Sequence, residues 1–131
     1  MIKKIATGLL VLALMVVFSV AYAAPSVGDL IRFVPTQIIV SNNEVDVDGY
    51  FVNLNKQCDV MDFTNFDMTV YLDGSVLVDG RFGTINSFIV RAQSVYPQSF
   101  SFSGTHNLRN GVYACDDHFY ASFGASFTSR S

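Results

Sequence analysis

The chain has 131 residues, with eight basic and eleven acidic side chains that give a formal net charge of −3 at neutral pH. Half of the residues are hydrophobic, and the chain carries 12 phenylalanines and 6 tyrosines but no tryptophan. This much apolar surface excludes a disordered chain and predicts a packed aromatic core. The acidic balance and the scattered lysines and arginines argue against a nucleic-acid partner.

Residues 1–23 predict a secretory signal peptide. Two lysines precede an apolar run at 5–20, and Ala21-Tyr22-Ala23 supplies the small residues of a cleavage site. The run is also long enough for a membrane-spanning helix. The short basic start and the cleavage site favour removal after Ala23, which would leave an exported chain of 108 residues, with a net charge of −5 and no membrane span.

A short tail is expected at 24–29 and one domain at 30–131. The first apolar segment of that domain, 30–40, contains Pro35. Proline lacks the amide hydrogen that a central strand needs, so we expect an edge strand or two short pieces around a kink.

The segment 44–55 predicts a long central strand. Its first half alternates apolar and acidic side chains, which is the two-residue period of a half-buried strand. After Gly49 the apolar positions continue in the opposite phase. We therefore expect a β-bulge at Gly49 that returns the second set to the same face. The two sets are Val45 and Val47, and then Tyr50, Val52 and Leu54.

The rest of the chain predicts short strands joined by turns. The segment 66–73 alternates strictly and ends at Asp73-Gly74, a dipeptide favoured in two-residue hairpins. A return strand at 76–78 is expected to close at Asp79-Gly80. Further strands are expected at 82–90, 99–103, 112–115 and 119–128, with Tyr120, Phe123 and Phe127 available to the core. Seven to nine short strands without helical periodicity predict a single all-β antiparallel sandwich.

The only two cysteines are Cys58 and Cys115. In an exported domain one such pair most simply forms a disulfide, and two separately buried thiols are the alternative. The bond would also draw acidic residues together at one end of the sandwich.

The acidic residues beside the cysteines are Asp59 and Asp62, and Asp116 and Asp117. Four carboxylates held together would offer oxygen ligands to calcium. The alternative is a solvated acidic rim whose aspartates cap turns. No other cofactor is expected.

Catalytic motifs are missing from the sequence. The only histidines are His106 and His118, and the sequence contains no HExxH, GxSxG or phosphate-binding glycine loop. We therefore expect a non-catalytic protein, with an enzyme or an enzyme inhibitor as the third choice.

Four tyrosines, Tyr50, Tyr71, Tyr96 and Tyr120, are candidates for an exposed surface that stacks on sugars or docks a partner. Tyr71 is preferred together with Tyr50, because Tyr71 alternates with core residues and should face outward. Ordinary half-buried strand tyrosines are the alternative.

The segment Gly111-Val112-Tyr113-Ala114-Cys115 resembles the G-x-Y-x-C pattern of an immunoglobulin-type strand F. The resemblance implies an immunoglobulin-like sandwich in which Tyr113 forms a tyrosine corner. It also implies that Cys58 is the partner of Cys115, on or near strand B.

A second resemblance covers about 33–102. The segments 45–53 and 66–74, followed by Phe82, resemble the SLAP-type domain of bacterial surface-layer-associated proteins. That family is an exported β-sandwich without established catalytic residues. The resemblance implies a secreted, periplasmic or cell-surface location and a binding or structural role. The expected partner is a protein or glycan of the cell envelope, and a small carbohydrate- or calcium-binding module is the second choice.

Overall fold

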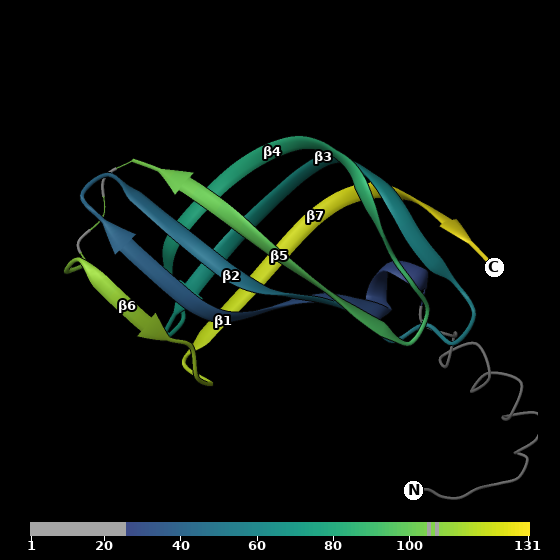
Figure 1. Ribbon diagram of the computed structural model, residues 1–131, viewed down its shortest axis with the longest axis horizontal. Helices are drawn as coiled ribbons and strands as arrows, with labels where there is room; N and C mark the ends of the chain where they lie inside the picture. Colours follow the sequence, from purple (N-terminus) through teal and green to yellow (C-terminus); the bar gives the residue numbers. More distant parts are fainter. Residues whose placement is uncertain (1–25, 105, 107) are drawn as a thin grey trace, which may run out of the picture.

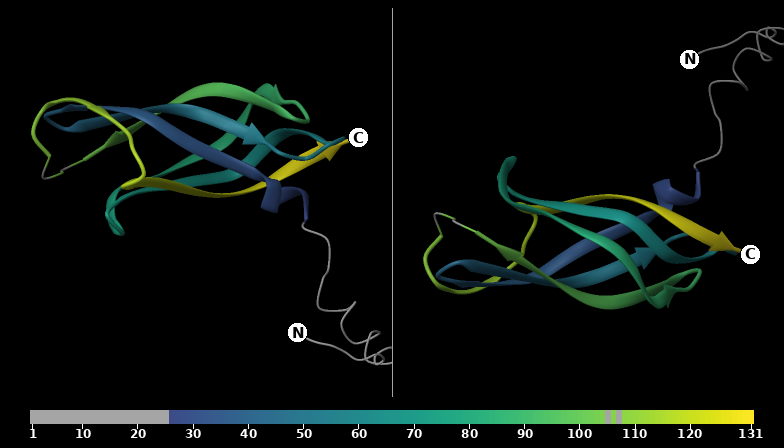
Figure 2. Two further views of the ribbon diagram at one scale, coloured as in Figure 1. Left: turned by 90° about the horizontal axis from the view of Figure 1, so that it is seen from below. Right: turned by 90° about the horizontal axis from the view of Figure 1, so that it is seen from above.

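The computed structural model describes residues 26–131 apart from 105 and 107. Two antiparallel sheets pack face to face, preceded by one turn of 3-10 helix (Figures 1 and 2). The elements are η1 (Val27–Leu30), β1 (Ile31–Ser41), β2 (Glu44–Asn53), β3 (Asp59–Leu72), β4 (Ser75–Val90), β5 (Ser94–Ser103), β6 (Gly111–Ala114) and β7 (Phe119–Arg130). The predicted all-β class is therefore confirmed.

The predicted signal peptide lies outside the described residues. Within the segment expected as a tail, η1 begins at Val27, and this side chain packs against the core. In the described part of the chain, no helix has the length and apolar character needed to cross a membrane.

One sheet has the strand order β5-β2-β1-β6 and the other has the order β4-β3-β7, and all recorded pairs are antiparallel. The pair β3–β7 joins segments that lie far apart in the sequence, and β7 passes behind the first sheet in Figure 1. The two-residue hairpin predicted at Asp73-Gly74 is confirmed. It joins β3 to β4, and both residues have a positive φ (52° and 81°), as this hairpin turn requires.

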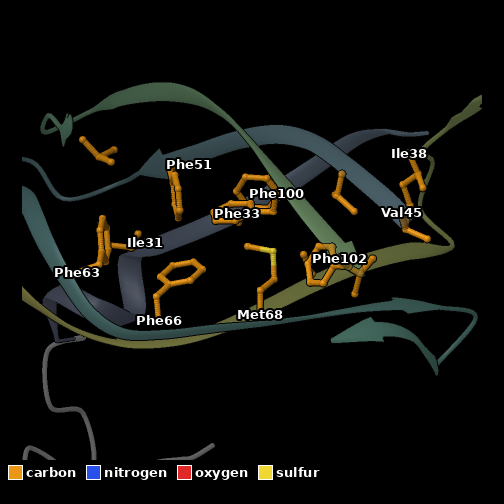
Figure 3. Close-up of a cluster of buried hydrophobic side chains, with 14 of the residues drawn as sticks. Ile31, Phe33, Ile38, Val45, Phe51, Phe63, Phe66, Met68, Phe100 and Phe102 are labelled. Atoms are coloured by element: carbon orange, nitrogen blue, oxygen red, sulfur yellow. The ribbon is translucent and has the colours of Figure 1, made fainter. Parts of the chain in front are cut away.

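Phenylalanine side chains from both sheets form the centre of the core (Figure 3). Phe51 of β2 is fully buried, and its ring lies 5.2 to 6.0 Å, between centroids, from six other phenylalanine rings. Most of these pairs meet edge to face, which is an arrangement that aromatic rings prefer. The six rings belong to Phe33, Phe63, Phe66, Phe88, Phe100 and Phe123.

The bulge predicted at Gly49 is wrong. Burial alternates through β2 without a break, so Gly49 and Phe51 face the core while Tyr50 faces solvent. The bulge lies in the neighbouring strand β1, where the register slips around Thr36. This core position requires glycine, because a side chain there would collide with the ring of Phe33.

The turn predicted at Asp79-Gly80 is also wrong, because β4 continues through it. Gly80 is paired with Met68 of β3, and a Cβ atom there would lie 3.1 Å from the ring of Phe102 in the opposite sheet. The glycine thus gives room for packing between the sheets, and the strand does not turn.

The edge strand predicted around Pro35 is wrong, because β1 is one continuous strand that lies between β2 and β6 in its sheet. β6 pairs with β1 only along Gln37–Val40, so the part of β1 that contains Pro35 has β2 as its only strand neighbour among the described residues. The alternative of two short pieces around a kink is not seen either: the strand continues through Pro35, and its register with β2 slips at Thr36.

The predicted disulfide is wrong, since Cys58 and Cys115 are both free thiols. Cys58 lies beside Asn53, which is paired with Ile31 at the start of β1. Cys115 donates its backbone N–H to the carbonyl of Thr36. Five residues of β1 separate these two places, about 16 Å along a strand, whereas a disulfide requires Cα atoms within about 7 Å.

Burial also makes Cys115 a poor nucleophile. Its partly buried position, and secondly the negative charge of Asp116, raise the pKa of the thiol to about 11. The side chain is therefore protonated at neutral pH.

Candidate functional site

The four acidic residues expected to form one cluster lie at two ends of the molecule. Asp59 is paired with Arg130 at the end of β7, whereas Asp116 and Asp117 precede the first residue of that strand. A 12-residue strand is about 40 Å long, so the predicted four-carboxylate calcium site does not form. Asp62 lies in β3 at a slip of register.

Asp59 has other partners. Its carboxylate accepts a hydrogen bond of 2.9 Å from the backbone N–H of Ala92 and lies 3.4 Å from the guanidinium of Arg91. These contacts hold the start of β3 to the loop after β4, which is a structural role.

The other end of β7 carries a cluster of acidic residues around His118. The ring Nδ1 of His118 lies 3.1 Å from Asp116 and 3.6 Å from Asp117, and Nε2 lies 3.9 Å from Asp73. The backbone N–H of Asp73 donates to the carbonyl of His118 at 2.8 Å. That bond ties the β3–β4 hairpin to the loop between β6 and β7. We name Asp73, Asp116 and Asp117 the acidic rim.

The acidic rim favours the protonated, positively charged form of His118. Hydrogen bonding and charge from Asp116, followed by the charges of Asp73 and Asp117, raise the pKa of His118 above its ordinary 6.5. The bond from the backbone N–H of His118 is the main cause that lowers the pKa of Asp116 below 3.8. Asp116, Asp117 and His118 could each turn one ligand atom toward a cation, but all three are exposed and we assign no metal to them.

These shifts set the pH window of the interaction. His118 and Asp116 are both charged between pH 3.8 and 6.5, so their stabilisation of the folded state is complete there. This stabilisation decreases as the pH rises through the raised pKa of His118. It also decreases as the pH falls through the lowered pKa of Asp116. Both groups are exposed, so solvent keeps this contribution small.

The charge partner of His118 can be tested by titration. We expect Asp116→Asn to lower the pKa of His118 toward 6.5, and Asp73→Asn to lower it less, because Asp116 is the nearer carboxylate. NMR titration of the His118 ring protons measures both changes. A midpoint that stays in place in Asp116→Asn would contradict this assignment.

Two tyrosines lie side by side on the outer face of the β4-β3-β7 sheet, next to the acidic rim. Tyr71 of β3 is paired with Tyr120 of β7, and their ring centroids are 6.0 Å apart. Val76 of β4 is paired with Tyr71 on its other side and is exposed. These three residues form an aromatic and apolar row across the sheet, which we name the tyrosine platform.

The platform differs from the one expected from the sequence. Tyr71 lies on the outer face as predicted, since the adjacent Val70 is fully buried. Tyr50 is 42% exposed but lies on the other sheet, so it shares no surface with Tyr71. Tyr96 stacks on Phe88 against the core. Tyr120, which the sequence assigned to the core or to a surface, is 60% exposed.

A shallow groove of about 440 Å³ joins the platform to the acidic rim. It has apolar ring faces on one side and carboxylate, imidazole and hydroxyl groups on the other. The residues that line it are Tyr71, Asp73, Gly74, Asp117, His118, Tyr120 and Ser122. Sequence reasoning missed the roles of His118, Asp73 and Ser122, because only the pairing of β3 with β7 brings them together.

Tyr113 holds the backbone that precedes β6. Its hydroxyl donates a hydrogen bond of 2.6 Å to the carbonyl of Arg109, four residues upstream. A tyrosine corner forms a bond of this kind to the preceding backbone. Tyr113 also packs against the core.

No protein-family model matches the sequence, and no curated protein matches it.

Proposed function

We propose that the protein is a non-catalytic binding module of the bacterial cell envelope or extracellular space, and that it binds a glycan at the tyrosine platform. The observation that carries this proposal is the pair of half-buried Tyr71 and exposed Tyr120 on the outer face, with carboxylates and an imidazole beside it. The predicted signal peptide supports the location. The resemblance to SLAP-type and immunoglobulin-like sandwiches supports a binding role, and the Tyr113–Arg109 bond is in keeping with the latter.

The chemistry of the groove suits a sugar better than an apolar ligand. A pyranose ring has an apolar C–H face that packs on an aromatic ring, and its hydroxyl groups donate and accept hydrogen bonds at the edge. Tyr71 and Tyr120 offer the ring faces. Asp73 and Asp117 accept hydrogen bonds only, whereas His118 and Ser122 can also donate. Apolar ligands prefer deep, enclosed pockets, and this groove is open.

A binding experiment with single tyrosine variants tests the proposal. A glycan array identifies a ligand, and isothermal titration then measures its affinity for each variant. We expect Tyr120→Ala to weaken binding about tenfold, which corresponds to about 1.4 kcal/mol for one stacked ring. Tyr71→Ala should have a similar effect, because the two rings form one surface.

Tyr50→Ala is the matched control. It removes an exposed strand tyrosine from the opposite sheet and should leave the affinity unchanged. Equal affinities in the wild type and in both platform variants would refute the proposal. An equal loss in Tyr50→Ala would show that the binding is not specific to the platform.

A further inference from the structure

The strands that border the two sheets are β4, β5, β6 and β7, and three of them carry features that block pairing with another chain. β5 contains Pro97, β6 is four residues long, and β4 carries Asp79 and Arg81. Prolines, charges and short length are the usual protections of a sheet edge. β7 has no proline and no charged side chain before Arg130. It is thus the one unprotected edge in the described part of the chain.

The flank of β7 is also incompletely covered. Among the described strands β7 pairs only with β3, and a cleft of about 250 Å³ separates it from the start of β1. Phe119, Phe123 and Phe127 point from β7 toward the core but stay partly exposed, whereas Phe63 and Phe66 of β3 are fully buried. A strand added beside β7 would cover these rings and pair with its free backbone groups.

We propose that the strand added at this edge is β7 of a second copy, paired antiparallel about a two-fold axis. A two-fold axis places the same strand opposite itself, so any charge would face a like charge. β7 avoids this cost, because residues 119–129 are uncharged. The product is a closed dimer with one six-stranded sheet in the order β4-β3-β7-β7-β3-β4.

The dimer would change how the platform works, a consequence that rests on the proposed function. Antiparallel pairing at a sheet edge keeps the outer faces of both sheets on one side. The two tyrosine platforms would therefore face the same way, and both could bind one repetitive glycan. Linked sites of this kind bind more tightly than single sites without any new contact.

Charge substitutions on β7 test the dimer. Ser122 and Ser126 are exposed on its outer face. The wild type should sediment as a dimer over a roughly hundredfold range of protein concentration, and it should dissociate into monomers only at the lowest concentrations. Ser122→Lys/Ser126→Lys and Ser122→Asp/Ser126→Asp should each be monomers, because each places like charges across the axis. An equimolar mixture of the two should recover the dimer mass.

The matched control is Thr84→Lys/Ser87→Lys, which adds the same charges to exposed positions of β4 and should stay dimeric. Analytical ultracentrifugation reads the mass, and circular dichroism checks that each variant is folded. A monomeric wild type at all concentrations, open-ended aggregates, or a dimeric Ser122→Lys/Ser126→Lys variant would overturn the proposal. Failure to bind any glycan would leave the mass unchanged, so the two proposals can fail separately.

Discussion

Gly49→Ala is expected to destabilise the protein by about 3 kcal/mol or more. A Cβ atom at this position would collide with the carbonyl oxygen of Val34 and would lie 2.7 Å from the ring of Phe33. Neither neighbour can move freely, because Val34 contributes backbone and Phe33 is 3% exposed within the core. Forcing atoms into a packed core typically costs 1 to 3 kcal/mol and sometimes more. Urea unfolding followed by circular dichroism measures the change.

Gly124→Ala is the control for this experiment. It makes the same chemical change in another strand, but the nearest atom is a carboxylate oxygen of Asp67 at 3.2 Å, at the end of an exposed side chain that can move. We expect a change below about 1 kcal/mol, because alanine also restricts the unfolded chain. If both variants unfold at the same urea concentration, the close packing of Phe33 on β2 is not needed for stability.

Local patterns predicted the parts of the fold that depend on neighbouring residues. Strict alternation identified the strand that ends at Leu72, and Asp73-Gly74 identified its hairpin, because positive φ angles suit these residues. The strand expected at 99–103 is also present, and its alternating Phe100 and Phe102 lie in the core. In each case the cause acts within a few residues along the chain.

The errors arose where a distant residue decides the outcome. Gly49 and Gly80 were taken as interruptions of a strand, yet each one makes room for a phenylalanine ring from another strand. The cysteine count predicted a disulfide, but the strand order separates Cys58 from Cys115. Neither the packing of the rings on the two glycines nor the separation of the two cysteines can be deduced without knowing how the strands pair.

The candidate site shows the same limit. The outward direction of Tyr71 could be predicted from alternation, but its partner could not. Tyr120 lies 49 positions later and meets Tyr71 only because β7 pairs with β3. The position of His118 depends on the same pairing, which also brings the loop before β7 to the β3–β4 hairpin.

A buried asparagine pair closes the end of the sandwich opposite the tyrosine platform. Asn53 is 1% exposed, and its Nδ2 group donates to the carbonyls of Cys58 and Val90 at 2.8 and 3.1 Å. Its Oδ1 atom accepts from the backbone N–H and the side-chain amide of Asn55, both at 2.9 Å. Asn55 also donates to the carbonyl of Val27 at 3.1 Å. The pair thus joins η1 and the ends of β2, β3 and β4.

Asn53→Ala is expected to destabilise the protein by about 3 kcal/mol and to lower its melting temperature by roughly 12 °C or more. Asn53 uses all four of its hydrogen-bonding positions, so the alanine variant leaves two carbonyls, one backbone N–H and the side-chain amide of Asn55 without this partner. Each buried polar group that loses its partner costs about 1 to 3 kcal/mol. Thermal unfolding by calorimetry measures the loss, and Asn86→Ala, at an exposed position of β4, should change little.

Asn53→Asp separates hydrogen bonding from side-chain volume, because the two side chains are nearly the same size. A carboxylate keeps the acceptor toward Asn55 but turns a negative oxygen toward the carbonyls of Cys58 and Val90. We expect this variant to be less stable than Asn53→Ala at pH 7 and to regain stability, relative to wild type, as the pH falls and the carboxyl gains a proton that it can donate. A loss of stability that is the same at pH 7 and in acid would show that volume at this position, and not donation to the two carbonyls, holds the end of the sandwich together.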